Sequence, residues 1–352
     1  MAGNILSALI WVQSTTWSSY LLSRAVGGLS EGNVQLAIAI LSDITPPETR
    51  SRSLALVGLA FSICFCIGPP IGAYFSTHPF QFQSMLNPKL ELNIYATPAL
   101  ITVVLLVVET IFLAAALPET RNQVINPKET EKSASGEKAG KKNSNGNVPP
   151  VVSRLHRLAL VKKAKHLHFY FLIAFSGVEF TLTFLTYDLF DWNNARNGRL
   201  LAAIGVLSAL FQGGYTRTAT RKVGEGVMAR RGVISCAIGF LLLSSLPHLD
   251  ALWAPRVVYL AAGFLAFTSA TVVSSLTALV SLQCEENVSN WESSALSKGK
   301  ALGQFRSSGQ LGRAIGPLLA CASYWTFGPA VTYSTAAVSM LTLAFTMRTI
   351  KN

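Results

Sequence analysis

The sequence has few charged residues for its length. Asp, Glu, Lys and Arg together make up 13% of its 352 residues, about half of the roughly 25% that soluble domains carry. Hydrophobic residues make up 50% of the chain and gather in uncharged runs, several of which exceed the roughly 18 residues that cross a bilayer. This composition excludes a cytosolic enzyme, a nucleic-acid-binding module and a disulfide-stapled secreted domain, and it predicts a multi-pass integral membrane protein.

The sequence also lacks the residue clusters of enzymes and metal proteins. Four of its five cysteines lie inside apolar runs, where cysteine behaves as a small hydrophobic residue and not as a redox or zinc ligand. The chain contains no glycine-rich phosphate-binding loop that would use ATP. His166 and His168 share a basic flank without further ligands, so we expect both at the level of the lipid headgroups and not at a metal site. We therefore expect that the protein is not an enzyme and that it binds neither a metal ion nor a cofactor.

Ten apolar stretches predict membrane-spanning helices, and a polar cluster at 14–19 divides the first two. The stretches cover about 3–16, 18–42, 53–76, 94–117, 167–187, 199–217, 231–248, 256–283, 303–326 and 329–347. Residues 118–165 are instead rich in Lys, Gly, Ser, Asn and Pro, a composition that favours disorder. The sequence predicts an all-α fold with an N-terminal bundle of four spans at 1–117, a disordered cytosolic linker at 118–165 and a C-terminal bundle of six spans at 166–352.

The basic residues support this arrangement of spans. With the linker in the cytosol, most of the 29 Lys and Arg residues fall in loops on the cytosolic side, as the positive-inside rule requires. The net charge of +12 therefore needs no nucleic-acid partner. The partners that we expect are a small-molecule substrate, protons and membrane lipid.

Several segments of the chain combine charged residues, glycine and proline in short patterns. Arg24 is followed by Gly28, and Gly68 and Pro69 are followed by Gly72. These patterns resemble the fourth-helix motif and the fifth-helix antiporter motif of the major facilitator superfamily, in particular of its drug:proton antiporter branch. Residues 42–51 resemble the loop after the fourth helix, residues 212–231 resemble a degenerate copy of the basic loop motif, and 175–182 and 312–317 resemble the tetracycline-transporter-like members.

The resemblance implies two bundles with a substrate bound between them near the middle of the membrane. It implies transport of a small organic solute, an organic anion or an amphipathic drug, by alternating access coupled to protons. The alternative is a receptor-like or truncated homologue that only binds a ligand or partner, and flux measurements separate the two. The basic loop between the family's second and third helices is missing from the sequence. In addition, two predicted spans precede the span that contains Gly68 and Pro69, whereas four spans lie between the linker and the span that contains Gly316 and Pro317. We therefore expect that the N-terminal two of twelve helices are missing from this chain.

Ionisable residues at membrane depth are candidates for function, because each costs about 2.5–3.5 kcal/mol on insertion scales. Cavity arginines would attract an anion, and a carboxyl group in apolar surroundings can carry a proton. The alternative is that some form structural ion pairs or reach the headgroups. Six such residues are candidates for substrate binding or proton coupling: Arg24, Glu31, Glu109, Glu179, Arg306 and Arg313. Spacings of seven put Arg24 with Glu31, and Arg306 with Arg313, on one helical face.

Small residues and prolines within the spans are candidates for helix packing. Glycines four residues apart let helices approach closely, and proline inside a helix can bend it. The residues concerned are Gly28, Gly32, Gly68, Pro69, Gly72, Gly312, Gly316 and Pro317. We expect them to pack helices first, with a direct role in conformational change as the alternative.

Overall fold

The computed structural model describes residues 1–45, 96–117, 151–284 and 296–349, together with single residues between 53 and 75. Within these ranges the backbone forms helices and no strand. The expected all-α fold is confirmed. Much of the expected span at 53–76, and the part of the expected linker at 118–150, lie outside the described residues.

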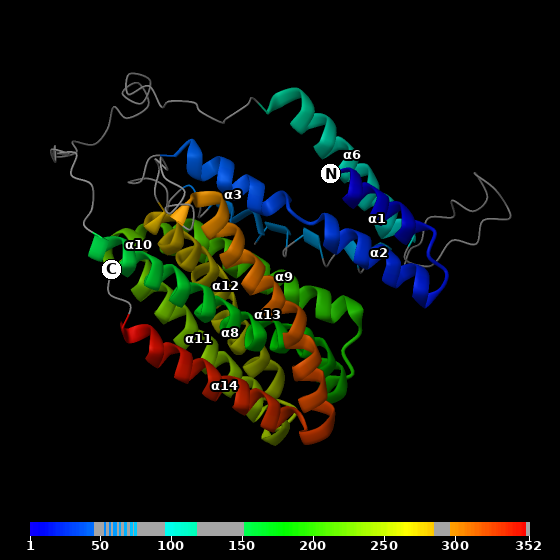
Figure 1. Cartoon of the computed structure of the whole chain (residues 1–352). Helices are drawn as coiled ribbons and strands as arrows, with labels where there is room; N and C mark the ends of the chain where they lie inside the picture. The colour runs from blue at the N-terminus through cyan, green and yellow to red at the C-terminus, as the bar shows by residue number, and fades with distance from the viewer. Residues whose placement is uncertain are drawn as a thin grey trace.

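The N-terminal part contributes four described helices. They are α1 (Ala2–Val12), α2 (Trp17–Ser30), α3 (Asn33–Asp43) and α6 (Ala96–Ala116), of which α1 packs against α2 and α6. The hydroxyl groups of Ser7 and Ser23 each donate to the other residue's carbonyl oxygen, at 2.7 and 3.0 Å, and so join α1 to α2. Figure 1 shows α1, α2 and α6 together on one side of the C-terminal helices.

The expected span at 18–42 is two helices and not one. α2 ends at Ser30, and α3 begins at Asn33. Between them, Glu31 has extended backbone angles (φ −74°, ψ 106°) and Gly32 has φ −149° and ψ −7°. Glycine costs more conformational entropy than other residues in a helix, so a break at this site is favourable. The expectation that Arg24 and Glu31 share one face of a continuous helix is therefore wrong.

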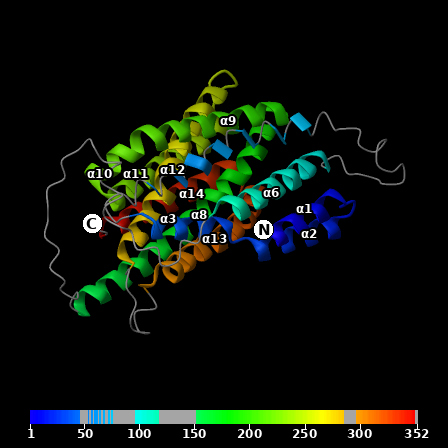
Figure 2. The same ribbon diagram turned by 90° about the horizontal axis from the view of Figure 1, so that it is seen from above.

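The C-terminal part forms a bundle of long helices joined by short turns. Its elements are α8 (Val151–Phe190), α9 (Asn194–Leu210), η1 (Phe211–Thr216), α10 (Arg217–Val223), α11 (Glu225–Ser245), η2 (Leu246–His248), α12 (Ala254–Gln283), α13 (Lys298–Phe327), α14 (Pro329–Thr346) and η4 (Met347–Thr349). α8 packs against α13, and α11 packs against α12 and α14. In the view from above, α3 runs beside α13 (Figure 2), with which it is in contact.

The start of α8 corrects the predicted linker boundary. The linker was expected to extend to residue 165, but α8 already begins at Val151. Leu160, Val161 and Ala164 recur at helical spacing and pack on the core. These apolar contacts stabilise a helix in a segment whose many basic residues suggested disorder.

The outer surface of the protein is apolar, as a bilayer requires. Among the described residues, four helices are long and apolar enough to span a membrane: Ala96–Ala116, Arg154–Phe190, Glu225–His248 and Ala254–Gln283. α13 has 30 residues, which correspond to roughly 45 Å of helix. Large apolar side chains such as Leu318, Trp325 and Phe345 are exposed on α13 and α14, an arrangement that suits contact with lipid and not with water.

Candidate functional site

α8 and α13 approach each other through glycines. A Cβ atom added at Gly312 would collide with the carbonyl oxygen of Phe169, and one added at Gly316 would collide with that of Ile173. Gly177 on α8 likewise faces the backbone of Gly316. The two helices therefore pack backbone against backbone, as small residues at membrane helix contacts permit.

This contact brings two of the candidate charged residues together. Nη2 of Arg313 on α13 donates a hydrogen bond to Oε2 of Glu179 on α8 at 3.4 Å. The side chain of Glu179 is 28% exposed and that of Arg313 is 46% exposed. Neither is sealed in the core, so the pair can open without a large rearrangement of the helices.

The Arg313–Glu179 pair lies at a cavity between the N-terminal and C-terminal parts. The cavity has about 990 Å³ of empty space, counted with its opening to solvent. α3 contributes Ile38, the segment after it contributes Val57 and Phe61, and the remaining walls come from α8, α12 and α13. We refer to this space as the central cavity.

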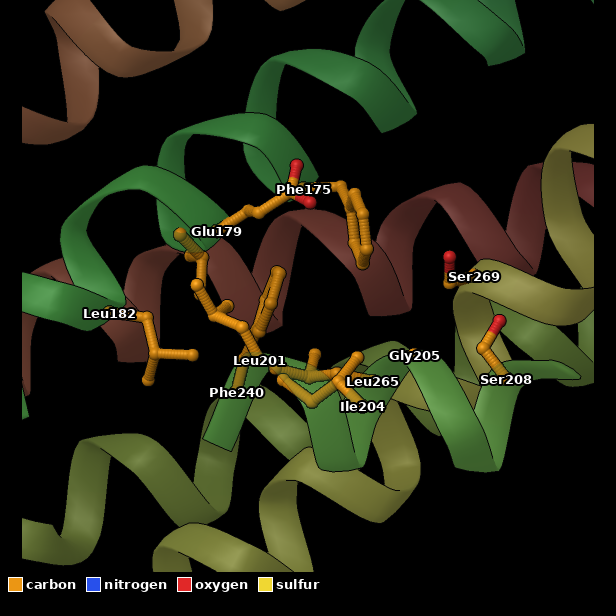
Figure 3. A pocket seen from close by; sticks show the side chains of 11 residues that line it. Phe175, Glu179, Leu182, Leu201, Ile204, Gly205, Ser208, Phe240, Leu265 and Ser269 are labelled. Carbon is orange, nitrogen blue, oxygen red and sulfur yellow. The ribbon is translucent and has the colours of Figure 1, made fainter. Parts of the chain in front are cut away.

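A second, smaller cavity lies further along α8, toward the C-terminal end of that helix. It has about 510 Å³ of empty space and is bounded by α8, α9, α11 and α12. Figure 3 shows the side chains around it, which are largely apolar. Phe175, Glu179 and Ser269 line both this space and the central cavity. Glu179 therefore stands between the two spaces, within reach of a molecule in either.

Arg306 lies in the wall of the central cavity, about two turns before Arg313 on the same face of α13. It is 8% exposed, and its Nε atom has no hydrogen-bond partner among the described residues. The guanidinium carbon lies 6.0 Å from the centre of the Phe61 ring, within the range of a cation–π contact. A buried cation with an unused donor is costly unless an anion or other acceptor joins it.

His168 lies next to Arg306 in the same cavity wall, which the sequence analysis did not foresee. It was expected at the headgroups, but it is 2% exposed, so that expectation is wrong. Its ring stacks on Phe305 at 4.2 Å, Nδ1 lies 3.2 Å from the Phe305 carbonyl oxygen, and Gly309 leaves room for the ring. The signal was present in the sequence, since His168 keeps helical spacing with the buried Phe171 and Leu172.

Three other candidate residues lie elsewhere. Arg24 is exposed, and its guanidinium carbon lies 4.5 Å from the centre of the Trp11 ring and 5.3 Å from that of Tyr20. Glu31 caps the end of α2, and Glu109 is exposed on α6. None of the three lines either cavity, because α2 and α6 lie to one side of α8 and α13.

The other four glycines that were candidates for packing differ from Gly312 and Gly316. These are Gly28, Gly32, Gly68 and Gly72, and a Cβ atom added at any of them would meet no atom within 4 Å among the described residues. The close packing expected for these four is therefore not seen in the described part of the chain. Pro69 lies outside that part, and Pro317 lies inside α13.

A polar network that the sequence analysis did not single out joins α8, α13 and α14. Tyr324 donates its hydroxyl proton to Oδ2 of Asp188 at 2.6 Å. Tyr333 donates to the hydroxyl oxygen of Thr181 at 3.1 Å. Hydrogen bonds between apolar helices satisfy groups that lipid cannot, so this network fixes how the three helices pack.

Helices of bilayer length around a charged internal cavity define a polytopic membrane protein of the kind that handles small solutes. The family model of the Major Facilitator Superfamily matches residues 1–317, and the chain therefore belongs to the Major Facilitator Superfamily. The resemblance noted in the sequence is confirmed, and the chain is a multi-pass membrane protein.

Individual relatives agree with this assignment. The chain is 29% identical over 354 residues to the Major facilitator superfamily domain-containing protein 10 of Mus musculus, covering 97% of this chain and 69% of that protein. The crystal structure of the human organic anion transporter MFSD10 (TETRAN) matches with a TM-score of 0.70 at 26% identity, covering 98% of this chain and 75% of that chain. Tetracycline resistance protein, class E, of Escherichia coli is 24% identical over 262 residues, covering 73% of this chain and 56% of that protein.

Proposed function

We propose that this chain carries small organic anions across a membrane by alternating access, coupled to protons. Membership of the Major Facilitator Superfamily supports transport over catalysis. The solved human relative is an organic anion transporter, which supports an anionic substrate class here as well.

The observation that carries the proposal is Arg306. It is a buried cation in the cavity wall with an unused donor among the described residues. A carboxylate or sulfonate of a substrate would accept a charge-assisted hydrogen bond from this guanidinium and offset the cost of burying it. An organic cation would be repelled by the same group.

The lining of the central cavity supports an amphipathic anion. Phe61, Phe171 and Phe175 line it and would contact the apolar body of a substrate, while the arginines hold its charge.

The ion pair between Arg313 and Glu179 supports proton coupling. While Glu179 is ionised, it occupies Arg313. A proton taken up on the carboxylate of Glu179 cancels that attraction and leaves Arg313 to bind the substrate anion. Anion binding would therefore strengthen as the pH falls, through the range in which Glu179 takes up its proton.

The close packing of α8 on α13 would connect the pair formed by Arg313 and Glu179 rigidly to the rest of the bundle. Gly312 and Gly316 hold the two backbones in contact, and Pro317 removes one hydrogen bond from α13 next to this contact. We assign these three residues to packing. Glu179 and Arg313 then move with their helices when the cavity changes its access.

The experiment that tests the proposal is uptake of an organic anion into proteoliposomes that contain the purified chain. The anion is compared with its neutral amide analogue of nearly equal size. Uptake of the anion above that of empty liposomes, and above that of the analogue, is expected. Saturable binding of the anion without flux would instead support the alternative of a receptor-like homologue.

A further inference from the structure

A groove on the outer face of the C-terminal bundle plays no part in the proposed transport. It runs between α8 and α14 and has about 1300 Å³ of empty space, counted with its open side. It is lined by α8 between Ala159 and Ala174 and by α14 between Ser339 and Thr346. We refer to it as the outer groove.

The outer groove is basic at one end and apolar at the other. Lys162, Lys163 and His166 lie within about one turn of α8 and form the basic end. Tyr170 and Ile173 follow on the same helical stripe, one and two turns further into the span, and form the apolar end. A ligand that fits both ends has a negative head and a hydrocarbon chain.

The position of the groove in the membrane agrees with such a ligand. α8 begins, and α14 ends, on the side that the positive-inside rule places in the cytosol. In Figure 1 the end of α14 lies on the same side of the bundle as the beginning of α8, and the two helices are in contact. The basic end therefore lies at headgroup level, and Tyr170, which is 59% exposed, lies where aromatic residues meet the interface.

We propose that the outer groove binds an anionic phospholipid of the cytosolic leaflet. Lys162, Lys163 and His166 contact its phosphate and headgroup, and an acyl chain lies along Tyr170 and Ile173 against α14. Basic pockets between membrane helices on the cytosolic side are suited to anionic headgroups. The hydroxyl groups of Ser339 and Thr342 donate to carbonyl oxygens of α14, so the α14 wall presents mainly carbon to the chain.

The test is lipid binding by the full chain in detergent, measured by native mass spectrometry. The probes are palmitoyl-oleoyl phosphatidylserine and the phosphatidylcholine with the same chains. We expect a phosphatidylserine adduct of higher affinity. Lys162→Gln combined with His166→Gln should weaken it by about fivefold or more, since one lysine near a membrane surface contributes about that factor. Thr342→Phe, which places a bulky side chain in the groove, should weaken it similarly while keeping every charge.

The matched control is Lys300→Gln combined with His248→Gln. These two residues are also exposed and lie outside the outer groove, so the control should keep the wild-type affinity. Equal weakening in the control would show diffuse attraction and overturn the proposal, as would unchanged affinity in both groove variants. Displacement of the lipid by glycerol phosphate at equal concentration would show a site for free phosphate and overturn it too. Each variant is checked for a single monodisperse species first, and the readout does not depend on whether the chain transports anions.

Discussion

Arg313 on α13 donates a hydrogen bond to the carboxylate of Glu179 on α8, across 134 residues of sequence and 3.4 Å of space. The pair lies between two cavities, because Glu179 lines both. A change in the charge of Glu179 is therefore felt by whatever occupies the central cavity.

The first prediction concerns the proton. Glu179→Gln keeps the size of the side chain but fixes it in a neutral state, so Arg313 stays available to the anion at every pH. Anion affinity in the wild type should rise as the pH falls, whereas the variant should bind with little pH dependence. Equilibrium binding between about pH 5 and pH 8 measures this.

The matched control for that experiment is Glu109→Gln. Glu109 is also a carboxylate at membrane depth, but it is exposed on α6 and lies outside both cavities. It should keep the wild-type pH profile. A Glu179→Gln protein with the same profile as the wild type would remove Glu179 from the coupling.

The second prediction concerns the choice of charge. Arg306→Ala should weaken an organic anion by roughly ten- to a hundredfold, because a hydrogen bond to a charged group contributes about 1.5–3 kcal/mol. The neutral analogue should lose much less. Arg256→Ala, which removes an exposed arginine at the start of α12, is the control and should change neither affinity. Equal losses for both ligands in Arg306→Ala would indicate a packing role instead.

The third prediction concerns the glycines. Gly312→Ala and Gly316→Ala place a methyl group against the carbonyl oxygens of Phe169 and Ile173, so each should destabilise the fold by about 1–3 kcal/mol. Gly28→Ala meets open space and should leave stability unchanged or raise it by up to about 1 kcal/mol. Thermal unfolding in detergent ranks the three, and an equal effect in all of them would argue against close packing of α8 on α13.

The fourth prediction concerns the network at the other end of these helices. Tyr324→Phe removes the hydrogen bond to Asp188 and leaves a carboxylate without that donor, at a cost of about 1–3 kcal/mol. Tyr187→Phe is the control, because that side chain is 61% exposed and its loss should be small. The same unfolding assay measures both, and a Tyr324→Phe protein as stable as the control would show that the bond does not hold the helices together.

The sequence predicted the helices well where apolar residues recur at helical spacing, as in α12 and α14. The prediction of helix boundaries failed where core packing or a local break in the backbone overrides the composition of the segment. The basic residues of 151–165 suggested disorder, but Leu160 and Ala164 face the core and extend α8. At Glu31 and Gly32, the mainly apolar composition of 18–42 concealed a break in the helix.

The site was predictable in kind but not in arrangement. A charged residue at membrane depth is unusual enough to single out Glu179, Arg306 and Arg313 from sequence. Their meeting depends on how α8 packs on α13, which no local pattern specifies. For the same reason Arg24 could not be told apart from the other arginines, because its contact with Trp11 depends on how α1 packs on α2.

The most direct test of the account is anion flux driven by a pH gradient alone. Proteoliposomes with equal anion concentrations inside and outside are given a pH step, and net anion movement is followed. A difference of one pH unit supplies about 1.4 kcal/mol per proton, which corresponds to an anion gradient of roughly tenfold, so a measurable accumulation is within reach. We expect net movement for the wild type and for Glu109→Gln, and none for Glu179→Gln. Equal accumulation by Glu179→Gln and the wild type would contradict it.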